Sequence, residues 1–301
     1  MKFLSFFGHL NIDVKLGVLN LPMPGEATSV KNLNNVYAGT AGNFAFVSKS
    51  LGVDYDLYAA VSRSTHSGFL DFLRQRNIDY KHIKIFDDDT GPICYIASDG
   101  KEQIAYMYQG PVYTKWKPSE YFEYDNYRYI HFGTGPAEEY IKIAEKNKNS
   151  KIVFDPGQET WYMYTKNTAM AMINLSNIMI INNNEFSYLL KMVQHTKDDL
   201  LNYLDYIIVT CGSHGSVIYS KDGEKHFDAY LTKDIHDTVG AGDSFRAGFY
   251  FGLYNNFNIE DSVKLGNIVA SYAIRKPIID FSVKKDDLMR ILRIYNQTEV
   301  L

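Results

Sequence analysis

Short apolar runs recur along the chain and are bounded by turn residues. Runs rich in β-branched and aromatic residues cover residues 3–8, 55–62, 127–133, 151–157, 177–183 and 206–212. This composition is typical of strands buried on both faces of a parallel sheet. Helical spacing, with apolar positions three and four apart, covers residues 42–52, 66–77, 136–149 and 185–196. Because the two patterns alternate, the chain is predicted to have an α/β fold with a layered sheet.

Two stretches interrupt this alternation. Residues 91–111 read as two strands around the turn at Ser98, Asp99 and Gly100, which predicts a hairpin. Residues 14–36 also show a strand-and-turn pattern without a helix. We expect the two segments, roughly 14–38 and 88–112, to form a small separate sheet that acts as a lid. No linker or repeat is visible, so residues 1–301 are expected to form a single domain into which the lid is inserted.

The charge balance excludes some classes of partner. Lys and Arg total 31 and Asp and Glu total 35, a net charge of −4 that is spread without long runs. This distribution argues against nucleic acid and against an anionic membrane surface. The two cysteines, Cys94 and Cys211, have neither zinc-binding nor disulfide spacing, which fits a reducing, cytoplasmic setting. The N-terminal apolar run is too short for a spanning helix and lacks a signal-peptide pattern.

The sequence "DTVGAGDSFRAGF", residues 237–249, carries the strongest chemical signal. We expect residues 226–237 to enter it as a strand and residues 244–256 to leave it as a helix, so that Gly240–Asp243 form a strand-to-helix turn. Free N–H groups at a helix N-terminus attract an anion, and a backbone with few side chains lets the anion approach. A carboxylate there, Asp243, makes sense as the base that takes a proton from a hydroxyl attacking a phosphoryl group. Taken alone, the pattern favours a simple capped helix after a glycine turn.

Further motifs occur in order along the chain. "GHLNID" covers residues 8–13, "AGTAGNFAFVSKSLG" covers 38–52, "NNNE" covers 182–185 and "VTCGSHGS" covers 209–216. In these motifs and in residues 237–245, the chain resembles the PfkB, or ribokinase-like, family of carbohydrate and nucleoside kinases. The resemblance covers nearly the whole chain, with alanine in place of one glycine of the N-terminal signature. It implies a three-layer α/β/α domain with a mostly parallel central sheet and a small β-sheet lid.

The resemblance implies a role for each motif. Asp243 corresponds to the catalytic base, and Gly240, Ala241 and Gly242 correspond to the anion hole for the transferred phosphoryl group. The asparagine and glutamate of the "NNNE" motif correspond to residues that organise Mg²⁺, directly or through water, around the donor ATP. An Asn-rich helix cap is the alternative interpretation. The implied metal residues are Asn182 and Glu185. The implied nucleotide-binding residues are Asn182, Thr210, Gly212, Gly215 and Asn267, of which the last also fits a helix-packing role.

The acceptor side is predicted from Asn11 and Asp13, which lie two apart at the expected end of the first strand and so share a face. With Asn43 they offer the paired donors and acceptors that neighbouring hydroxyls of a ribose-like ring need. Thr40 belongs to the same glycine-flanked helix start, and Gly39 permits close approach of the sugar. No Walker A motif occurs in the chain, so a P-loop architecture is not supported.

Departures from the family pattern bear on the acceptor. Ribokinases tend to carry a glutamate where this chain has residues 133–135, "GTG", which argues against free ribose. The segments "IAYMYQGP", "HFGTGPAEEY" and "FDPGQE" are similar to members acting on nucleosides. Tyr106, Tyr108 and Phe132 are candidates for the surface that a nucleobase needs, although ordinary packing explains each singly. The segment "PIID" lacks the Gly-Ala pair of members that bind a monovalent cation, so that cation is left open.

The sequence therefore predicts an ATP-dependent kinase that transfers the γ-phosphoryl group to a primary hydroxyl of a ribose-containing acceptor, with a nucleoside favoured. A free-sugar kinase of the ribokinase or fructokinase type is the alternative within the family. A non-catalytic binding protein is disfavoured by the intact Asp243 motif, and a vitamin kinase by the acceptor residues. The expected partners are the acceptor and ATP, and a homodimer through the lid is a further expectation, because lid sheets in this family often pair.

Overall fold

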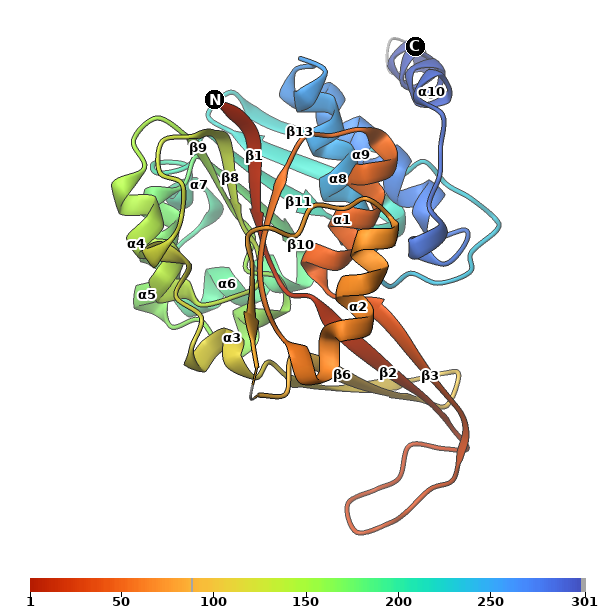
Figure 1. The fold of residues 1–301 in the computed structure, drawn as a ribbon. Helices are drawn as coiled ribbons and strands as arrows, with labels where there is room; N and C mark the ends of the chain where they lie inside the picture. The colour runs from red at the N-terminus through yellow and green to blue at the C-terminus, as the bar shows by residue number, and fades with distance from the viewer. Residues whose placement is uncertain (88, 299–301) are drawn as a thin grey trace.

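The computed structural model of the protein describes residues 1–87 and 89–298; residue 88, at the edge of the expected lid segment, and residues 299–301 lie outside it. Within the described residues, nine strands form a central sheet in the order β13-β12-β11-β10-β9-β8-β1-β4-β5 (Figure 1). Neighbours from β11 to β5 run parallel, and β12 and β13 add an antiparallel edge. These strands are β1 (Lys2–Phe7), β4 (Asp56–Ser62), β5 (Ile83–Phe86), β8 (Tyr127–Phe132), β9 (Lys151–Phe154), β10 (Ile178–Asn182), β11 (Tyr206–Thr210), β12 (Ser216–Ser220) and β13 (Gly223–Phe227).

Helices cover both faces of the central sheet (Figure 1). One face is covered by α1 (Thr40–Leu51), α2 (Arg63–Gln75), α8 (Ala241–Tyr254), α9 (Ile259–Ala273) and α10 (Lys285–Thr298). The other is covered by α4 (Ala137–Lys146), α5 (Lys166–Leu175), α6 (Asn183–Val193) and α7 (Lys197–Leu200). Short helical turns are α3 (Pro111–Thr114), Pro118–Glu120, Gly157–Trp161, Gly212–His214 and Ile278–Asp280. In the part of the chain that the structure describes, no helix combines the length and apolarity needed to cross a membrane.

The central sheet is buried on both faces, as its continuous apolar runs predict. In β4, Leu57, Ala59 and Val61 pack into the core beneath α1 and α8, while Tyr58 and Ala60 pack into the core on the other side. Successive strand residues point to opposite faces, so a strand that is apolar at every position fills two cores. The predicted layered α/β fold with a mostly parallel sheet is therefore confirmed.

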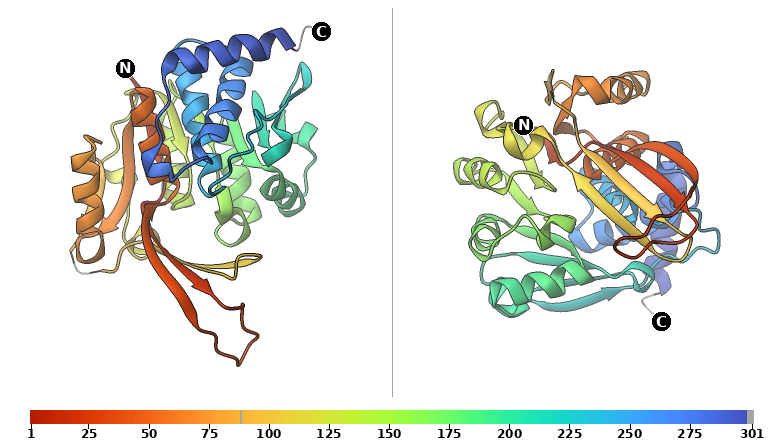
Figure 2. Two further views of the ribbon diagram at one scale, coloured as in Figure 1. Left: turned by 90° about the vertical axis from the view of Figure 1, so that its right-hand side faces the viewer. Right: turned by 90° about the horizontal axis from the view of Figure 1, so that it is seen from below.

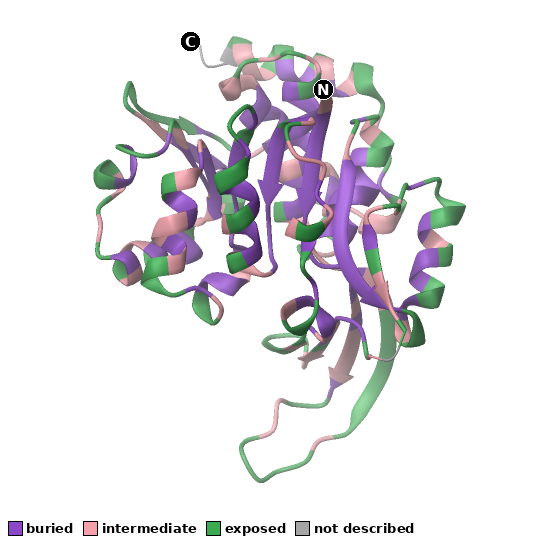
Figure 3. Ribbon diagram, turned by 60° about the vertical axis from the view of Figure 1, so that its left-hand side comes forward, coloured by how far each residue is buried: buried purple, intermediate pink, exposed green. Residues whose placement is uncertain are grey.

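The two stretches that interrupt the alternation form a separate sheet. Its strand order is β3-β2-β6-β7, with β2 (Asn11–Val18), β3 (Val30–Ala38), β6 (Ile93–Ser98) and β7 (Gln103–Tyr108). Figure 2 shows this four-stranded sheet projecting from the body beyond the carboxyl ends of the central strands. The connection between β2 and β3 is largely exposed (Figure 3). The hairpin and the second small sheet were both predicted from the sequence pattern.

Two local expectations are wrong. Asn11 and Asp13 open β2 in the small sheet instead of ending β1, because the chain leaves the central sheet at Gly8 to pass α1. Residues 228–240 form a loop instead of a strand. The reason is where the neighbouring strand begins. The first residue of β12, Ser216, pairs with Phe227 in the antiparallel ladder, so β12 has no residue left with which residues after Phe227 could pair.

Candidate active site

Two cavities meet at the amino-terminal end of α8. The first cavity, of about 300 Å³, lies between the four-stranded sheet and the carboxyl ends of the central strands. The second cavity, of about 260 Å³, lies between the end of β11, the loop 228–240 and α9. Thr210 and Gly242 line both cavities. Ligands of open α/β sheets bind outside the carboxyl ends of the strands, so adjoining cavities here suit two ligands that meet at α8.

The residues predicted to hold the acceptor all line the first cavity: Asn11, Asp13, Gly39, Thr40 and Asn43. The Oδ1 atoms of Asn11 and Asn43 are buried without a hydrogen-bond partner among the described residues. Buried polar atoms are normally paired, so orphan acceptors in a cavity wall suit the hydroxyl groups of a ligand. Asp13 is also buried, and this burial raises the pKa of its carboxyl to about 7.

The start of α1 is fixed in place by tight backbone packing. Gly39 has a φ of 91°, and a Cβ atom there would lie 2.4 Å from the carbonyl oxygen of His9. The next residue, Thr40, accepts a hydrogen bond at Oγ1 from the His9 N–H at 3.1 Å and shares another with Thr134 Oγ1 at 2.7 Å. Only glycine fits the crossing at position 39. The crossing therefore sets where Asn43, one turn later, enters the first cavity.

Asp243 lies in the first turn of α8, in the wall of the first cavity. Its Oδ2 accepts a hydrogen bond from Nδ2 of Asn43 at 2.8 Å, and its Oδ1 accepts one from Nη1 of Arg246 at 3.0 Å. Burial raises the pKa of the Asp243 carboxyl to about 6, and Arg246 and Asn43 oppose the rise. A buried carboxylate that is ionised near neutral pH is suited to accept a proton from a bound hydroxyl.

The backbone ahead of Asp243 leaves hydrogen-bond donors free. Gly240 caps α8 with a φ of 79°, and the N–H of Ala241 donates to the carbonyl of Thr238 at 3.2 Å. The N–H groups of Gly242 and Asp243 have no partner among the described residues. Unpaired donors and the positive end of a helix dipole attract an anion. The donors available to an anion are therefore those of Gly242 and Asp243, while Ala241 contributes to the wall of the second cavity.

Sequence reasoning missed Arg246 and Asp155. Asp155 follows β9, is buried, and accepts two hydrogen bonds from the guanidinium of Arg246, one of them from Nη2 to Oδ1 at 2.6 Å. Burial raises the pKa of Asp155, and Arg246 opposes the rise. Arg246 was detectable, because it lies three residues after Asp243 within the same motif and so on the same face of the helix. Asp155 gave only the weaker signal of an acid at the end of an apolar run.

Asn182 and Glu185 stand at the end of β10 and the start of α6. The Asn182 side chain accepts a hydrogen bond from the Glu185 N–H at 2.9 Å, and Glu185 Oε2 accepts one from the Asn182 N–H at 3.2 Å. This reciprocal pair is a capping box. Both residues also line the first cavity, and burial raises the pKa of the Glu185 carboxyl to about 7, with Asp155 adding to the rise. The helix-cap arrangement is thus present, and it leaves Oε1 of Glu185 for a ligand.

The second cavity holds the remaining predicted residues: Thr210, Gly212, Gly215 and Asn267. Gly215 has a φ of 81°, and a Cβ there would meet the Phe227 carbonyl at 2.0 Å, so the turn after β11 requires glycine. The Asn267 Nδ2 donates to Ser216 Oγ at 2.9 Å and to the Asp228 carbonyl at 3.3 Å. Asn267 therefore ties α9 to the start of the loop 228–240. Most of this cavity wall is apolar, including Tyr230, Phe245 and Ile274.

The assignment of three aromatic residues to a nucleobase-binding surface is wrong. Tyr106 and Tyr108 are 65% and 49% exposed on the outer face of β7, and Phe132 is fully buried in the core. Alternation along β7 instead turns Gln103, Ala105 and Met107 into the first cavity. Ala105 and Met107, together with Ile96 and Cys94 of β6, give this part of the cavity wall an apolar surface.

No carboxylate enters the first cavity from residues 133–135. Thr134 is buried there, and the nearby Glu159 is buried as well, with Oε2 accepting the Gly135 N–H at 2.6 Å. Glu159 Oε1 lies 3.2 Å from Nε2 of His9. Burial lowers the pKa of His9 to about 3 and raises that of Glu159 well above its usual value, so burial disfavours the charged form of both groups. Among the described residues, the carboxylates that line the cavity are Asp13, Glu185 and Asp243.

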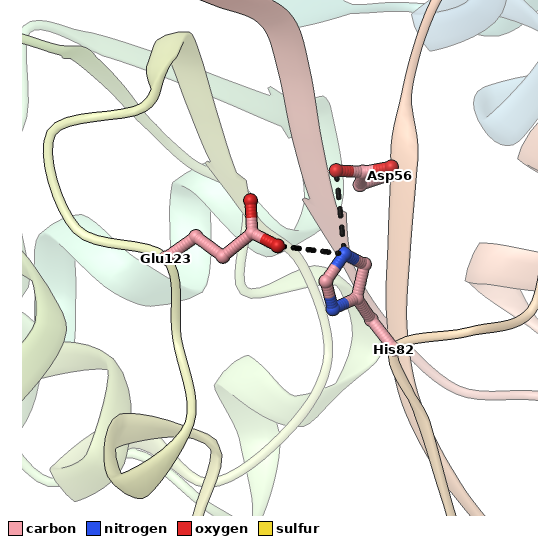
Figure 4. Close-up of side chains that lie close together, drawn as sticks. All are labelled: Asp56, His82 and Glu123. Carbon is pink, nitrogen blue, oxygen red and sulfur yellow. Dashed lines mark ion pairs between the residues drawn. The ribbon is translucent and has the colours of Figure 1, made fainter.

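A group of three metal-type side chains lies at the opposite end of the central sheet. Figure 4 shows Asp56, His82 and Glu123, with His82 Nε2 at 3.4 Å from Asp56 and 3.6 Å from Glu123. Lys2 Nζ already bridges the two carboxylates, at 2.7 Å and 2.6 Å, and Lys81 reaches Asp56 at 3.0 Å. Because ammonium groups already neutralise the acids, this cluster is an ion-pair network at the start of β1 and β4.

The family model for "pfkB family carbohydrate kinase" matches residues 1–285. The chain belongs to the PfkB family. A nucleoside kinase of Thermoplasma acidophilum is 40% identical over 297 residues, covering 99% of this chain and 98% of that protein. A crystal structure of a putative ribokinase from the same organism is 38% identical with a TM-score of 0.88 and covers 99% of both chains. The Methanocaldococcus jannaschii nucleoside kinase, an archaeal member of the ribokinase family, is 27% identical with a TM-score of 0.87 and covers 98% of this chain and 99% of that chain.

This membership fixes the class of enzyme. The chain is a PfkB-family phosphotransferase with an alcohol group as acceptor and ATP as the donor that the family implies. The predicted resemblance is confirmed over nearly the full length, and the ribokinase-like fold with it. The match is consistent with the order of motifs that the sequence displays.

Proposed function

We propose that this PfkB kinase phosphorylates a primary hydroxyl of a nucleoside, with ATP in the second cavity and the nucleoside in the first. The observation that carries the proposal is the placement of Asp243: it lines the first cavity directly after Gly242, which lines both cavities, and Asn43 from the acceptor wall holds its carboxylate. The similarity to nucleoside kinases supports the choice of acceptor. A general base and an adjoining anion site are the two parts that phosphoryl transfer to an alcohol needs.

In this mechanism, Asp243 takes the proton of the acceptor hydroxyl as its oxygen attacks the γ-phosphorus. The bond from that phosphorus to the bridging oxygen of ADP breaks, and ADP leaves with the electron pair. The N–H groups of Gly242 and Asp243 stabilise the charge on the transferred group. Asn11, Asp13 and Asn43 hold the ribose hydroxyls and set the direction of attack.

Magnesium fits the donor set at the end of β10. A hard cation prefers oxygen ligands and keeps several waters, so one free carboxylate oxygen, Oε1 of Glu185, is sufficient as a direct or water-mediated ligand. Asn182 would act by fixing Glu185, because its own side-chain oxygen is already used in the helix cap. When bound, the ion neutralises charge on the triphosphate.

The inner face of the four-stranded sheet favours a nucleoside over a free sugar. Ile96, Ala105 and Met107 present an apolar surface in the wall that also holds Asp13. A nucleobase gains from such a surface, whereas a free ribose or fructose has no large apolar face to bury. Gln158, in the same wall, supplies an amide for the polar edge of a base.

The test is a parallel screen of phosphoryl transfer from ATP to nucleosides, ribose and fructose, with the product mass identified. We expect turnover of at least one nucleoside, and in Asp243→Asn a fall of about 10²–10⁴-fold with ATP binding retained, as for loss of a general base. Turnover of the free sugars alone would replace the nucleoside assignment. Turnover unchanged in Asp243→Asn would remove Asp243 from the mechanism.

We further propose that residues 1–301 act as one kinase domain with the four-stranded sheet as its lid, and that two copies pair through the sheet's outer face. Leu33, Tyr95 and Tyr106 lie on that face and are 59%, 43% and 65% exposed, and the last two are cross-strand partners. Such an apolar patch is typical of an interface. A Tyr106→Lys variant that sediments as a monomer beside a dimeric wild type supports this; a monomeric wild type contradicts it.

The reaction consumes ATP, and Cys94 and Cys211 are free thiols. Both facts support our proposal that the enzyme works in the cytoplasm.

A further inference from the structure

Arg246 is the only cationic side chain in the wall of the first cavity, counting residues 1–87 and 89–298. The carboxylates of Asp155 and Asp243 accept hydrogen bonds from it, and Glu185 adds a third negative charge nearby. The guanidinium is planar and rigid, and its Nη1 serves Asp243 while Nε and Nη2 serve Asp155. One group therefore connects the end of β9 with the first turn of α8.

The surroundings hold this guanidinium in one orientation. A Cβ atom at Gly242 would lie 3.0 Å from Nη1, so the glycine leaves the space that Arg246 occupies. Behind Asp155, Nε2 of His131 lies at 3.6 Å, and Nδ1 of His131 lies 3.0 Å from the hydroxyl of Tyr250. Arg246 and Asp155 are 12% and 1% exposed, so water competes little for their hydrogen bonds.

We propose that Arg246 is a positioning residue for phosphoryl transfer: Asp155 fixes its guanidinium, and the guanidinium fixes Oδ1 of Asp243 so that the carboxylate faces the acceptor hydroxyl. The proposal rests on the proposed kinase function. Asn43 holds Oδ2 from the opposite side, so the two donors set the plane of the carboxylate. A base that is free to rotate spends less time in line with the hydroxyl, and small misplacements of a reacting group cost large factors in rate.

The test compares steady-state kinetics of Arg246→Met, Arg246→Lys and the pair Arg246→Met/Asp155→Asn with the wild type. The paired variant removes both buried charges, so it stays informative if Arg246→Met alone, which strands Asp155, fails to fold. We expect kcat to fall roughly 10²-fold in the Met variants, with KM for ATP and for the nucleoside within a few-fold of the wild type. Arg246→Lys should recover part of kcat, because the charge remains while the fork is lost.

A double-mutant cycle decides whether Arg246 acts through Asp243. In the Asp243→Asn background, Arg246→Met should lower kcat no further, since the group it positions is already disabled. The matched control is Arg74→Met: Arg74 Nη1 also lies 3.0 Å from the Oδ1 of an aspartate three residues away, Asp71, but on exposed α2. The kcat of the Arg74→Met variant should equal that of the wild type.

Two outcomes overturn the proposal. A kcat in Arg246→Met and in the paired variant that equals the wild-type value shows that Arg246 has no role in turnover. A raised KM for ATP, with a further loss of kcat in the Asp243→Asn background, shows that Arg246 binds the triphosphate instead. Absence of wild-type turnover on every nucleoside and sugar is a different result, because it rejects the proposed function itself.

Discussion

The amide Nδ2 of Asn43 lies 2.8 Å from Oδ2 of Asp243 and so joins two helix starts that are 200 positions apart in the sequence. The other side-chain atom of Asn43, Oδ1, is buried without a partner among the described residues. Asn43 thus holds the proposed base, Asp243, through its amide N–H group, while its amide oxygen is available to a ligand.

Replacing Asn43 should therefore affect both binding and turnover. We expect Asn43→Ala to lower kcat/KM for the nucleoside about 10- to 100-fold, because a hydrogen bond to a charged group contributes about 1.5–3 kcal/mol. KM for ATP should stay unchanged, since Asn43 lines the first cavity and not the second. Initial rates at varied concentrations of each substrate measure this. A rise in KM for ATP alone would contradict this prediction, because it would mean that Asn43 contributes to ATP binding and not to nucleoside binding.

The rate should depend on pH through Asp243. Burial raises the pKa of this carboxyl to about 6, and only the ionised form accepts a proton, so kcat/KM should fall as the pH drops through about 6. Asp13 titrates in the same cavity with a pKa of about 7 and reinforces the loss at low pH. A pH profile of kcat/KM in the wild type and in Asp13→Asn separates the two groups. A flat profile between pH 5 and 7.5 would be inconsistent with a base of this kind.

Much of the fold was predictable because burial imposes a pattern on the sequence. Apolar runs such as residues 177–183 are typical of strands covered on both faces, and the structure places this run in the central sheet. The end of a strand is less determined: residues 228–231 are as strand-like as β13, but β12 offers them no partner. Pairing with a neighbour is a tertiary property, and local sequence does not record it.

The candidate site was also predictable only in part from the sequence. Asn11, Asp13, Asn43 and Asp243 lie in motifs, and the structure brings them to one cavity. The face of β7 that lines this cavity was misjudged, since Tyr106 points outward and Met107 inward. A shift of one residue exchanges the two faces of a strand, and an exposed aromatic face has no signature that separates it from a ligand wall. Asp155 was missed because its partner, Arg246, is distant in sequence.

The metal role of Glu185 is testable without breaking its helix cap. Glutamine keeps an oxygen for the Asn182 N–H, so Glu185→Gln should retain the capping box and the fold. It loses the charge that a hard cation prefers, so we expect the Mg²⁺ concentration for half-maximal rate to rise several-fold. Titration of Mg²⁺ at saturating ATP measures the shift. A titration curve that superimposes on the wild-type curve would make Glu185 purely structural.

The ion-pair network around Asp56 should stabilise the fold without affecting turnover. The neighbouring His82, Lys2, Tyr127 and Lys81 hold the pKa of the Asp56 carboxyl below its usual 3.8 despite burial. A lowered pKa stabilises the folded state above pH 3.8, and this contribution is lost only as the pH falls below that value. We expect Asp56→Asn to cost about 1–3 kcal/mol of stability at pH 7, with kcat unchanged.

Thermal unfolding with and without Zn²⁺ completes that test. If Asp56, His82 and Glu123 form only ion pairs, added Zn²⁺ should leave the wild-type melting temperature where it is. A melting temperature that rises with Zn²⁺ in the wild type, but not in Asp56→Asn, would make the cluster a metal site.

An ion pair connects the four-stranded sheet to the body of the enzyme. Lys15 Nζ in β2 lies 2.8 Å from Oδ2 of Asp237, at the start of the motif that contains Asp243. Both partners are about one-third exposed, so the contact is easily broken and remade in water. Such a contact can hold the sheet over the first cavity without fixing it permanently.

The last prediction is that the four-stranded sheet closes on the acceptor. A kinase whose site stays open to water hydrolyses ATP, so closure should follow nucleoside binding, and the inner faces of β6 and β7 line the cavity where the nucleoside is proposed to bind. Hydrogen exchange of residues 93–108 should slow when nucleoside is added and should slow less in Lys15→Met, which lacks the contact to Asp237. The alternative is a fixed sheet that only covers an edge of the core. In that case, exchange in residues 93–108 would stay the same with and without nucleoside, while the amides around Asp243 alone became protected.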